Sequence, residues 1–298
     1  MTEPSNMRAI ALSAAYASTP PEVRREAAGA PTRLLDADRR LLENAVVVIT
    51  GGAGAIGSAA AEALSCVGAR VVIADSDYAA AAALEKKLRT VGGDATAWPV
   101  DVTSPESVRR FADEIDAAFD RIEAVINCAG IMIADPFLDV RFEDWQRVFR
   151  VNVDGTFLVT QAVARLMMKQ NHHPLLDRAG LIVCVSSLAA AMGRPVVPAY
   201  GASKAAIDHL GKTSSVTLGP SGISTLVVYP PTVRAGMWSG AVARMAEIEG
   251  ISVEDLEAQR RFEPAEDIAG VITDAVATPG LRLNGHLVLW TRDVGPLP

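Results

Sequence analysis

The chain has 298 residues, which is long enough for one large α/β domain or for two small ones. Half of its residues are hydrophobic and only 5% are aromatic, a composition typical of parallel sheets with cores of Ala, Val, Ile and Leu. The net charge of -7, with no cluster of Lys and Arg, argues against a surface that binds nucleic acid or anionic membranes.

The three cysteines, Cys66, Cys128 and Cys184, are an odd number and lie in apolar segments. We interpret them as buried free thiols in a reducing compartment, and neither as a disulfide framework nor as a metal site. No run of residues approaches the ~18 to 20 continuous apolar residues of a membrane span. We therefore expect a cytoplasmic protein that contacts no membrane and holds no metal.

Residues 1–43 form a predicted N-terminal extension that differs in character from the rest of the chain. Residues 1–32 are rich in Ala, Ser, Thr and Pro with little periodicity, which indicates a tail. The segment Ala9–Ala17 imitates a signal peptide, but it is short and Glu3 precedes it, so we do not expect export. The leucine pairs of segment 34–42 predict a short amphipathic helix at the domain edge.

The first strand of the domain organises the rest of the chain. Its apolar run Val46–Ile49 has no polar alternation, which predicts a parallel strand covered on both faces. Gly52, Gly54 and Gly57 then fit the G-x-G-x-x-G frame, in which absent Cβ atoms permit a tight turn beside a pyrophosphate. We expect a helix from Ser58 to Val67, whose first free amides would face that anion.

A second apolar strand, Val71–Ala74, ends at Asp75, near the ~20-residue offset expected for an acid that binds the adenosine ribose hydroxyls. Together with the glycine frame, this acid predicts a dinucleotide site. The alternative is a glycine-rich turn in some other α/β domain. We expect NAD to be preferred over NADP, because Asp75 would repel a 2′-phosphate and Ser76, not an arginine, follows it.

Beyond this acid, helices and strands alternate without repeats or an internal linker, which predicts one doubly wound parallel sheet in a three-layer α/β/α domain over residues 44–298. The expected elements are a helix Tyr78–Arg89, a helix from Ser104, and strands Thr96–Val100, Ala124–Ile126, Leu181–Val185, Thr225–Tyr229 and Gly285–Leu289. The small residues Asn127 to Gly130 follow one of these strands, at the edge where ligands bind in such sheets.

A long helix is expected over Phe142–Met168. It carries Asn152 and Gly155 in its interior, where both residues are poor helix formers. Such a broken local rule indicates a functional position.

The strand Leu181–Val185 ends at Ser186 and Ser187, and a loop leads to Tyr200 and Lys204 at the head of a helix. Residues four apart share one helix face. A tyrosine of reference pKa ~10 acts as a base near neutrality only if its phenolate is stabilised, which Lys204 and an oxidised nicotinamide ring would do. The alternative for an isolated pair of this kind is a surface contact.

Several spaced motifs in this order resemble the short-chain dehydrogenase/reductase family, single-domain type with a Rossmann-like sheet, from about Ala45 to about Trp290. The motifs that carry the resemblance are Thr50-Gly51, Ala55-Ile56-Gly57, Asp75, Asp101-Val102, Asn127 to Gly130, Asn152, Ser187, Tyr200 with Lys204, and the segment from Pro230 onward. The resemblance implies that Tyr200 is the general acid/base and that Ser187 orients the substrate oxygen. It also implies that Lys204 holds the nicotinamide ribose and lowers the pKa of Tyr200, while Asn152 anchors a water that relays protons to Lys204.

The same resemblance implies a set of cofactor-binding residues. They are Gly51, Gly54, Ile56, Gly57, Asp75, Asp101, Val102, Asn127, Ala129, Gly130, Tyr200, Lys204, Pro230 and Val233. The chain departs from the family pattern at several positions, among them Trp290 to Asp293, which replace the usual acidic-glycine ending. Ala55 replaces the usual middle glycine and Cys128 a common asparagine, while Pro231 stands in place of a glycine. Ala235 lacks the hydroxyl of the threonine that usually lies near the nicotinamide amide.

We therefore expect an NAD-dependent oxidoreductase that interconverts a secondary alcohol and a ketone by hydride transfer. One alternative is a nucleotide-binding regulator on the same fold, although a pure binder needs no Tyr200–Lys204 pair. The other is a nucleotide-sugar epimerase or dehydratase, which the lack of a second, C-terminal substrate domain disfavours.

We expect a homo-oligomer, specifically a homotetramer, with the helices from Phe142 and Pro198 paired at one interface. The expected substrate is a mainly apolar alcohol or ketone closed in by the segment Gly236–Phe262, with Trp238 as the best lid candidate. The alternative is that this segment merely packs on the domain. An inward-pointing Arg234 would instead favour a substrate with a carboxylate or phosphate.

Overall fold

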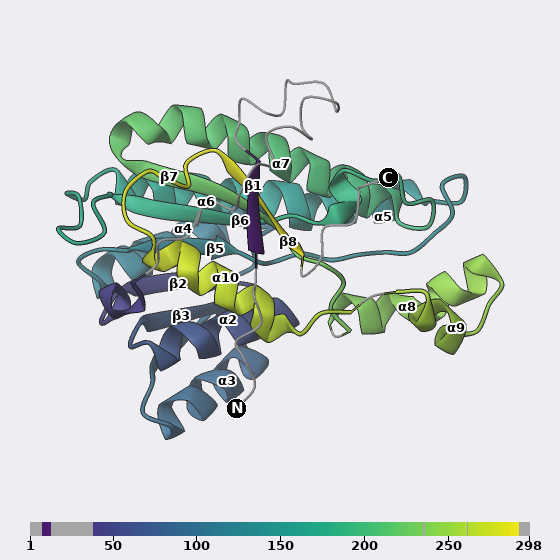
Figure 1. Ribbon diagram of the computed structural model, residues 1–298, viewed down its shortest axis with the longest axis horizontal. Helices are drawn as coiled ribbons and strands as arrows, with labels where there is room; N and C mark the ends of the chain where they lie inside the picture. The colour runs from purple at the N-terminus through teal and green to yellow at the C-terminus, as the bar shows by residue number, and fades with distance from the viewer. Residues whose placement is uncertain (1–7, 13–37, 235, 261, 292–298) are drawn as a thin grey trace.

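The computed structural model describes residues 8–12, 38–234, 236–260 and 262–291. Within these residues, eight strands form one sheet in the order β1-β8-β7-β6-β5-β2-β3-β4, and all neighbouring pairs are parallel except β1 with β8 (Figure 1). The strands are β1 Arg8–Leu12, β2 Val46–Thr50, β3 Arg70–Asp75, β4 Asp94–Pro99, β5 Ala124–Asn127, β6 Gly180–Val185, β7 Ile223–Tyr229 and β8 His286–Thr291. The α-helices are α2 Ala55–Cys66, α3 Tyr78–Thr90, α4 Pro105–Ala118, α5 Phe142–Phe149, α6 Gly155–Met167, α7 Pro198–Leu218, α8 Met237–Glu249, α9 Val253–Ala258 and α10 Ala265–Ala277.

Helices cover both faces of the sheet, as the unbroken apolar run of β2 predicts. Val47 and Ile49 pack in one core cluster, with side chains of α2, α3 and α10, and Val46 and Val48 pack in the other, with side chains of α4, α6 and α7. Figure 1 shows these two groups of helices on opposite sides of the sheet. The doubly wound, three-layer α/β fold is therefore confirmed.

The chain changes direction across the sheet between β2 and β5. Thr50, the last residue of β2, pairs with Ala74 of β3 on one side and with Asn127 of β5 on the other. From β2 the chain adds β3 and β4 outward, and it then returns to add β5 on the other side. The loops that follow β2 and β5 thus diverge at the carboxyl edge, which opens a crevice where doubly wound sheets bind their ligands.

Three features differ from the sequence predictions. Arg8–Leu12, expected as part of a tail, forms β1 and pairs antiparallel with β8, so it covers an edge that would otherwise expose unpaired backbone groups. Of the expected short helix, residues 34–37 lie outside the described residues, and Arg39–Leu42 forms a 3-10 helix whose Leu42 is buried. The three cysteines are free, as expected, but Cys66 at the end of α2 is exposed.

Helix α10 was not expected from the sequence. It packs against α2 and buries Ile268, Ile272 and Val276 on that side of the sheet. The signal was present in its first turn, where Glu266 and Asp267 suit the positive end of a helix dipole.

Helices α8 and α9 stand apart from the two main layers (Figure 1). They share a separate core cluster that includes Trp238, Met245 and Leu256, together with Val196 and Val197 from the loop before α7. The predicted segment Gly236–Phe262 therefore folds as a helical unit beside the entrance to α7. No helix in the described part of the chain is long and apolar enough to cross a bilayer.

Candidate active site

The turn after β2 is shaped by its glycines. Gly51 has φ of 63°, a left-handed conformation that favours glycine, and a Cβ atom there would lie 2.7 Å from the backbone nitrogen of Ala129. A Cβ atom at Gly57 would overlap the carbonyl oxygen of Gly51. Helix α2 begins at Ala55, three residues before the expected Ser58, so its first amides lie directly on the turn. The physical basis of the predicted phosphate cradle is therefore present.

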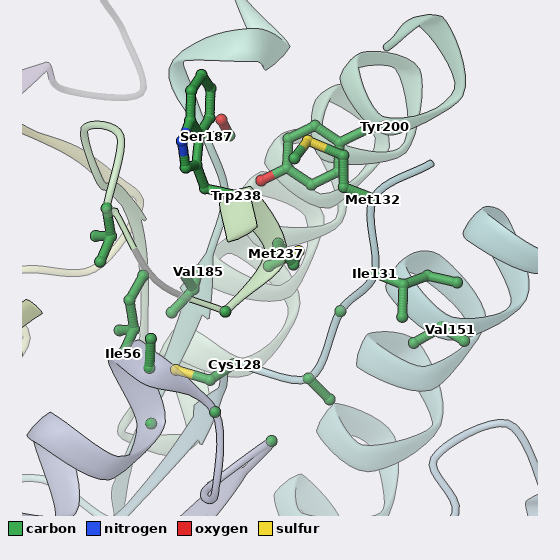
Figure 2. A pocket seen from close by; sticks show the side chains of 18 of the residues that line it. Ile56, Cys128, Ile131, Met132, Val151, Val185, Ser187, Tyr200, Met237 and Trp238 are labelled. Carbon is green, nitrogen blue, oxygen red and sulfur yellow. The ribbon is translucent and has the colours of Figure 1, made fainter. Parts of the chain in front are cut away.

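A cavity of about 700 Å³ extends along the carboxyl edge of the sheet from this turn to helix α8 (Figure 2). The predicted site residues that line it are Gly51, Gly54, Ile56, Gly57, Asp75, Asp101, Val102, Ala129, Gly130, Ser187, Tyr200, Lys204, Pro230 and Val233. Two predicted residues, Asn127 and Asn152, do not line the cavity and are buried behind its wall.

Asp75 closes the glycine turn at the end of β3. Its carboxylate accepts hydrogen bonds from the backbone amides of Ala53 and Asp77, each at 3.0 Å. Both acids line the cavity, and Asp77 also caps α3 by accepting from the amide of Ala80. The acid predicted from the sequence, Asp75, therefore lies beside the glycine turn and gives this part of the cavity a negative charge.

Asp101 and Val102 form the next part of the wall, after β4. Asp101 Oδ1 accepts from the amide and the hydroxyl of Thr103, at 2.9 and 2.7 Å, which fixes this loop. A Cβ atom at Gly155 would lie 2.7 Å from Cγ2 of Val102. The glycine in the interior of the predicted long helix thus allows the helix to approach a residue of the cavity wall.

Asn127 does not face the cavity as the cofactor prediction requires. Its side chain is 3% exposed and donates to Thr160 Oγ1 of α6 at 3.2 Å, while its Oδ1 has no hydrogen-bond partner among the described residues. The side chain turns to this helix because the alternation of β5 directs it into the layer below the loop. Cys128, Ala129 and Gly130 line the cavity in its place.

Asn152 lies where the long helix is interrupted. Residues Arg150–Asp154 form a π-helical turn between α5 and α6, a type of bulge often found at functional sites. The Asn152 amide accepts from the Ile131 backbone nitrogen at 2.8 Å and donates to the Ile131 carbonyl at 3.0 Å. It also donates to Ser203 Oγ at 2.9 Å, and Ser203 in turn donates to the carbonyl of Tyr200 at 2.7 Å. Asn152 therefore ties the loop after β5 to the helix that carries Tyr200.

Lys204 is only 2% exposed, yet it lines the cavity. Its ammonium donates to the backbone carbonyl of Val185 at 2.8 Å and lies 5.6 Å from the centre of the Tyr200 ring. Burial lowers the pKa of Lys204 from 10.5 to about 8, and nearby Cys128 and Asp208 oppose that shift. The predicted pair on one helix face is thus brought together inside the cavity and is not a surface contact.

Tyr200 and Ser187 meet across the cavity. Figure 2 shows the Tyr200 hydroxyl directed toward Ser187 and Trp238. Burial raises the pKa of Tyr200, and a hydrogen bond with Ser187 opposes this rise. The ammonium of Lys204 donates its hydrogen bond to the Val185 carbonyl, on the side of the cavity that Tyr200 also lines.

Ser186 lines the cavity, and its hydroxyl also belongs to a buried network that the sequence analysis missed. Its hydroxyl donates to Asp208 of α7 and lies 3.2 Å from the backbone carbonyl oxygen of Lys204. Asp208 also bonds Tyr229, and burial raises the pKa of its carboxyl. The spacing of Asp208 from Lys204, one helical turn, is the one sequence signal for this network.

The wall opposite Tyr200 comes from the segment after β7. Pro230 to Val233 line the cavity, and Thr232 forms a parallel bridge with Phe262. Ala235 lies outside the described residues. Arg234 does not point inward: its side chain is exposed, stacks on the Phe262 ring at 4.5 Å and lies 3.8 Å from Glu257.

Trp238 is both core residue and cavity wall. It is 7% exposed, donates from Nε1 to Glu257 at 3.0 Å and packs edge-on against Phe262 at 5.2 Å. It also lines the cavity together with Met237 and Met245. Trp238 thus packs in the core of this segment and also lines the cavity, and its role as a lid stays a prediction.

The chain is similar in sequence and in structure to known proteins. Residues 45–246, more than half of the chain, match the family described as short chain dehydrogenase. The chain is 32% identical to a sorbitol dehydrogenase of Cereibacter sphaeroides over 80% of this chain and 92% of that protein. It is 34% identical to a cyclopentanol dehydrogenase of Comamonas testosteroni over 64% of this chain and 74% of that protein. It is also similar to the crystal structure of an NAD+-bound xylitol dehydrogenase, with a TM-score of 0.72 and 30% identity over 79% of this chain and 93% of that one. The chain therefore belongs to the short-chain dehydrogenase family and is an NAD(P)-dependent oxidoreductase.

Proposed function

We propose that this protein interconverts a secondary alcohol and a ketone, with Tyr200 as the general acid/base and NAD as the preferred cofactor. The observation that carries the proposal is that Ser187, Tyr200 and Lys204 line the same cavity as the glycine turn. The names of the relatives, a sorbitol and a cyclopentanol dehydrogenase, support an alcohol as the substrate.

The cavity suits a dinucleotide along its length. The glycine turn and the start of α2 offer free amides to a pyrophosphate, and Asp75 stands where ribose hydroxyls would be bound. Gly130 allows the loop to lie close to Asn152, since a Cβ atom there would lie 3.2 Å from Asn152 Oδ1. When bound, the cofactor supplies the hydride acceptor or donor at its nicotinamide ring.

Side chains of the protein bind and transfer the proton of the substrate hydroxyl. In the oxidation direction, Tyr200 accepts the proton of the substrate hydroxyl, and the Ser187 hydroxyl donates a hydrogen bond to the substrate oxygen. Lys204 holds the nicotinamide ribose and stabilises the tyrosinate electrostatically. Its lowered pKa, about 8, allows it to exchange a proton near neutrality.

Asn152 acts in this proposal mainly as a positioning residue, because its side-chain amide is occupied by Ile131 and Ser203. Its backbone carbonyl accepts from the Thr156 hydroxyl at 2.7 Å and retains a second lone pair. The proposed water that relays protons to Lys204 would be held by that lone pair.

NAD preference rests on the charge at the end of β3. Asp75 and Asp77 both line the cavity there, and a 2′-phosphate beside two carboxylates would be repelled. The neighbouring residue Ser76 offers no compensating cation. The similar xylitol dehydrogenase has NAD+ bound in its crystal structure, which is in keeping with this preference.

A homotetramer is supported by apolar side chains left at the surface of the helices expected at an interface. Phe142 of α5, Phe157 of α6 and Val216 of α7 are exposed, Val216 to 76%. Exposed apolar residues on adjacent helices are typical of subunit contacts. Light scattering at micromolar concentration should give the mass of four chains, and the mass of one chain would contradict the tetramer.

The test of the proposed function is turnover. The purified protein is incubated with a panel of cyclic, linear and polyhydric secondary alcohols and with NAD+ or NADP+, and NAD(P)H formation is followed by absorbance. We expect several alcohols to be oxidised, faster with NAD+. Tight cofactor binding with no turnover of any alcohol or ketone would instead indicate a nucleotide-binding regulator.

A further inference from the structure

Three of the described arginines line the cavity, Arg147, Arg194 and Arg260, and the last two come from the segments that flank the Trp238 cluster. Arg194 lies in the loop before α7, six residues ahead of Tyr200, and its carbonyl accepts from the amide of Val197 at 3.2 Å. Arg260 comes from the opposite side, just after α9. Arg194 precedes Val196 and Val197, and Arg260 follows Leu256, so both arginines flank the core cluster that contains Trp238.

The positive charges of Arg194 and Arg260 repel each other. Burial lowers the pKa of Arg194, the charge of Arg260 lowers it further, and Glu249 opposes both effects. Like charges placed together in a half-buried site raise the free energy of the chain unless an anion compensates them. Glu249, at 3.5 Å from Arg260, supplies one negative charge for two positive charges.

The hydrogen-bonding capacity of the pair is also largely unused. Arg260 Nε is buried and has no hydrogen-bond partner among the described residues. The Arg194 guanidinium is seen to contact the sulfur of Met192 at 3.8 Å, and a thioether is a weak acceptor. A guanidinium presents five donors in a planar fork that matches carboxylate and phosphate oxygens.

Apart from Glu249, which does not line the cavity, no acid is found beside the pair among the described residues that line the cavity. Among the described residues, the acids that line the cavity are Asp75, Asp77 and Asp101, and all three follow β3 or β4 at the cofactor end. The nearby wall is apolar instead, with Trp238 and Met245. This end of the cavity is thus an apolar surface with an excess of one positive charge.

We infer that the substrate is an alcohol or ketone with an apolar body and an anionic end group, a carboxylate or a phosphate, which Arg194 and Arg260 bind. The inference rests on the proposed function, since it names the substrate of the same site. It replaces the expectation of a mainly apolar substrate, and it assigns the anion to these two arginines in place of the outward-facing Arg234.

The first measurement uses sets of secondary alcohols that differ only in a terminal methyl, carboxylate or phosphate. We expect kcat/KM to be higher for an anionic member than for its neutral partner by about tenfold or more, and the advantage to shrink as salt is added. The carboxylate and phosphate members show which anion is recognised. Equal or better kcat/KM for the neutral members would overturn the inference while leaving the proposed function intact.

The second measurement needs no turnover. Calorimetry on the NAD-loaded protein compares pentanoate, butyl phosphate and the neutral isostere pentanamide as ligands. At least one anion should bind about tenfold more tightly than the amide, and Arg194→Gln or Arg260→Gln should remove that difference. Arg194→Lys, which keeps the charge, should retain part of it.

Arg234→Gln is the matched control, because it removes an exposed arginine of the same segment that does not line the cavity. It should leave the preference for the anion unchanged. Equal binding of all three ligands, or an equal loss in the Arg234 variant, would refute the arginine site. Arginine-dependent anion binding without turnover of any alcohol would instead refute the proposed function and keep the anion site.

Discussion

The side-chain amide of Asn152 makes a reciprocal pair with the backbone of Ile131, accepting from its nitrogen at 2.8 Å and donating to its carbonyl at 3.0 Å. The same amide reaches Ser203 on α7. The loop after β5, the π-helical turn and the catalytic helix are therefore joined at one fully buried side chain. Any shift of Asn152 moves the wall of the cavity beside Lys204.

Replacing this residue should weaken both the fold and the cofactor site. Asn152→Leu keeps the volume but leaves the partly buried amide and carbonyl of Ile131 without their Asn152 partner, at a cost of about 1–3 kcal/mol for each group. We expect the free energy of unfolding to fall by about 2–5 kcal/mol and the dissociation constant of NADH to rise. Denaturant unfolding and fluorescence titration measure the two effects. Asn171→Ala, on an exposed loop, is the control, and equal effects of the two substitutions would contradict the role of Asn152.

Cofactor preference should depend on Asp75. Asp75→Asn preserves the shape at the end of β3 but removes the charge that faces a 2′-phosphate, so the ratio of kcat/KM for NADP to that for NAD should rise about tenfold. Asp94→Asn serves as the control, because Asp94 begins the neighbouring strand at its opposite end and pairs with Arg70. A wild-type enzyme that prefers NADP would refute the role of Asp75 outright.

The parts of the fold and site that depend on local sequence were predictable. The apolar run Val46–Ile49 specifies a strand buried on both faces, and Gly51 and Gly57 are required by backbone that approaches too closely for a Cβ atom. The pair Tyr200 and Lys204 shares a face because a helical turn brings residues four apart together. The interruption at Asn152 was visible as a poor helix former in a helix interior.

The parts that depend on tertiary packing were not predictable. The partner of Asn127, Thr160 of α6, lies 33 positions further along the chain, and only the packing of that helix against β5 brings the two side chains together. Likewise, Arg194 and Arg260 lie 66 positions apart in the sequence, and only the fold of the segment around Trp238 brings them to one cavity. Sequence reasoning selected Arg234 instead, because its position in the chain says nothing about the direction of its side chain.

Trp238 should affect both stability and substrate range. Trp238→Ala removes a side chain that is 7% exposed and contacts Phe262, so we expect a loss of about 3–5 kcal/mol in the free energy of unfolding. Because Trp238 also lines the cavity, kcat/KM should fall most for bulky apolar alcohols and least for small polar ones. Trp98→Ala controls for the loss of a partly buried tryptophan that does not line the cavity. A uniform loss across a graded series of alcohols would show that Trp238 supports the fold alone.

Cofactor affinity should decrease as the pH rises through about 8, the pKa to which burial lowers Lys204. Below this pKa the ammonium is charged and attracts the anionic cofactor, and above it the amine is neutral, so the dissociation constant of NADH increases with pH. Lys204→Arg keeps its charge over this range and should abolish the increase. A wild-type dissociation constant that stays level from pH 7 to about pH 9 would contradict this assignment.

The most direct test of the account is turnover by Tyr200→Phe beside wild type, with cofactor binding measured on the same samples. The substitution removes the hydroxyl that takes the proton and little of the shape of the cavity. We predict that kcat falls by about 10²–10⁴-fold while the dissociation constant of NADH stays within a factor of about two of the wild-type value. Tyr78→Phe, at an exposed tyrosine, should change neither quantity. A Tyr200→Phe enzyme with near wild-type kcat would remove Tyr200 from the mechanism and contradict the proposed function of this site.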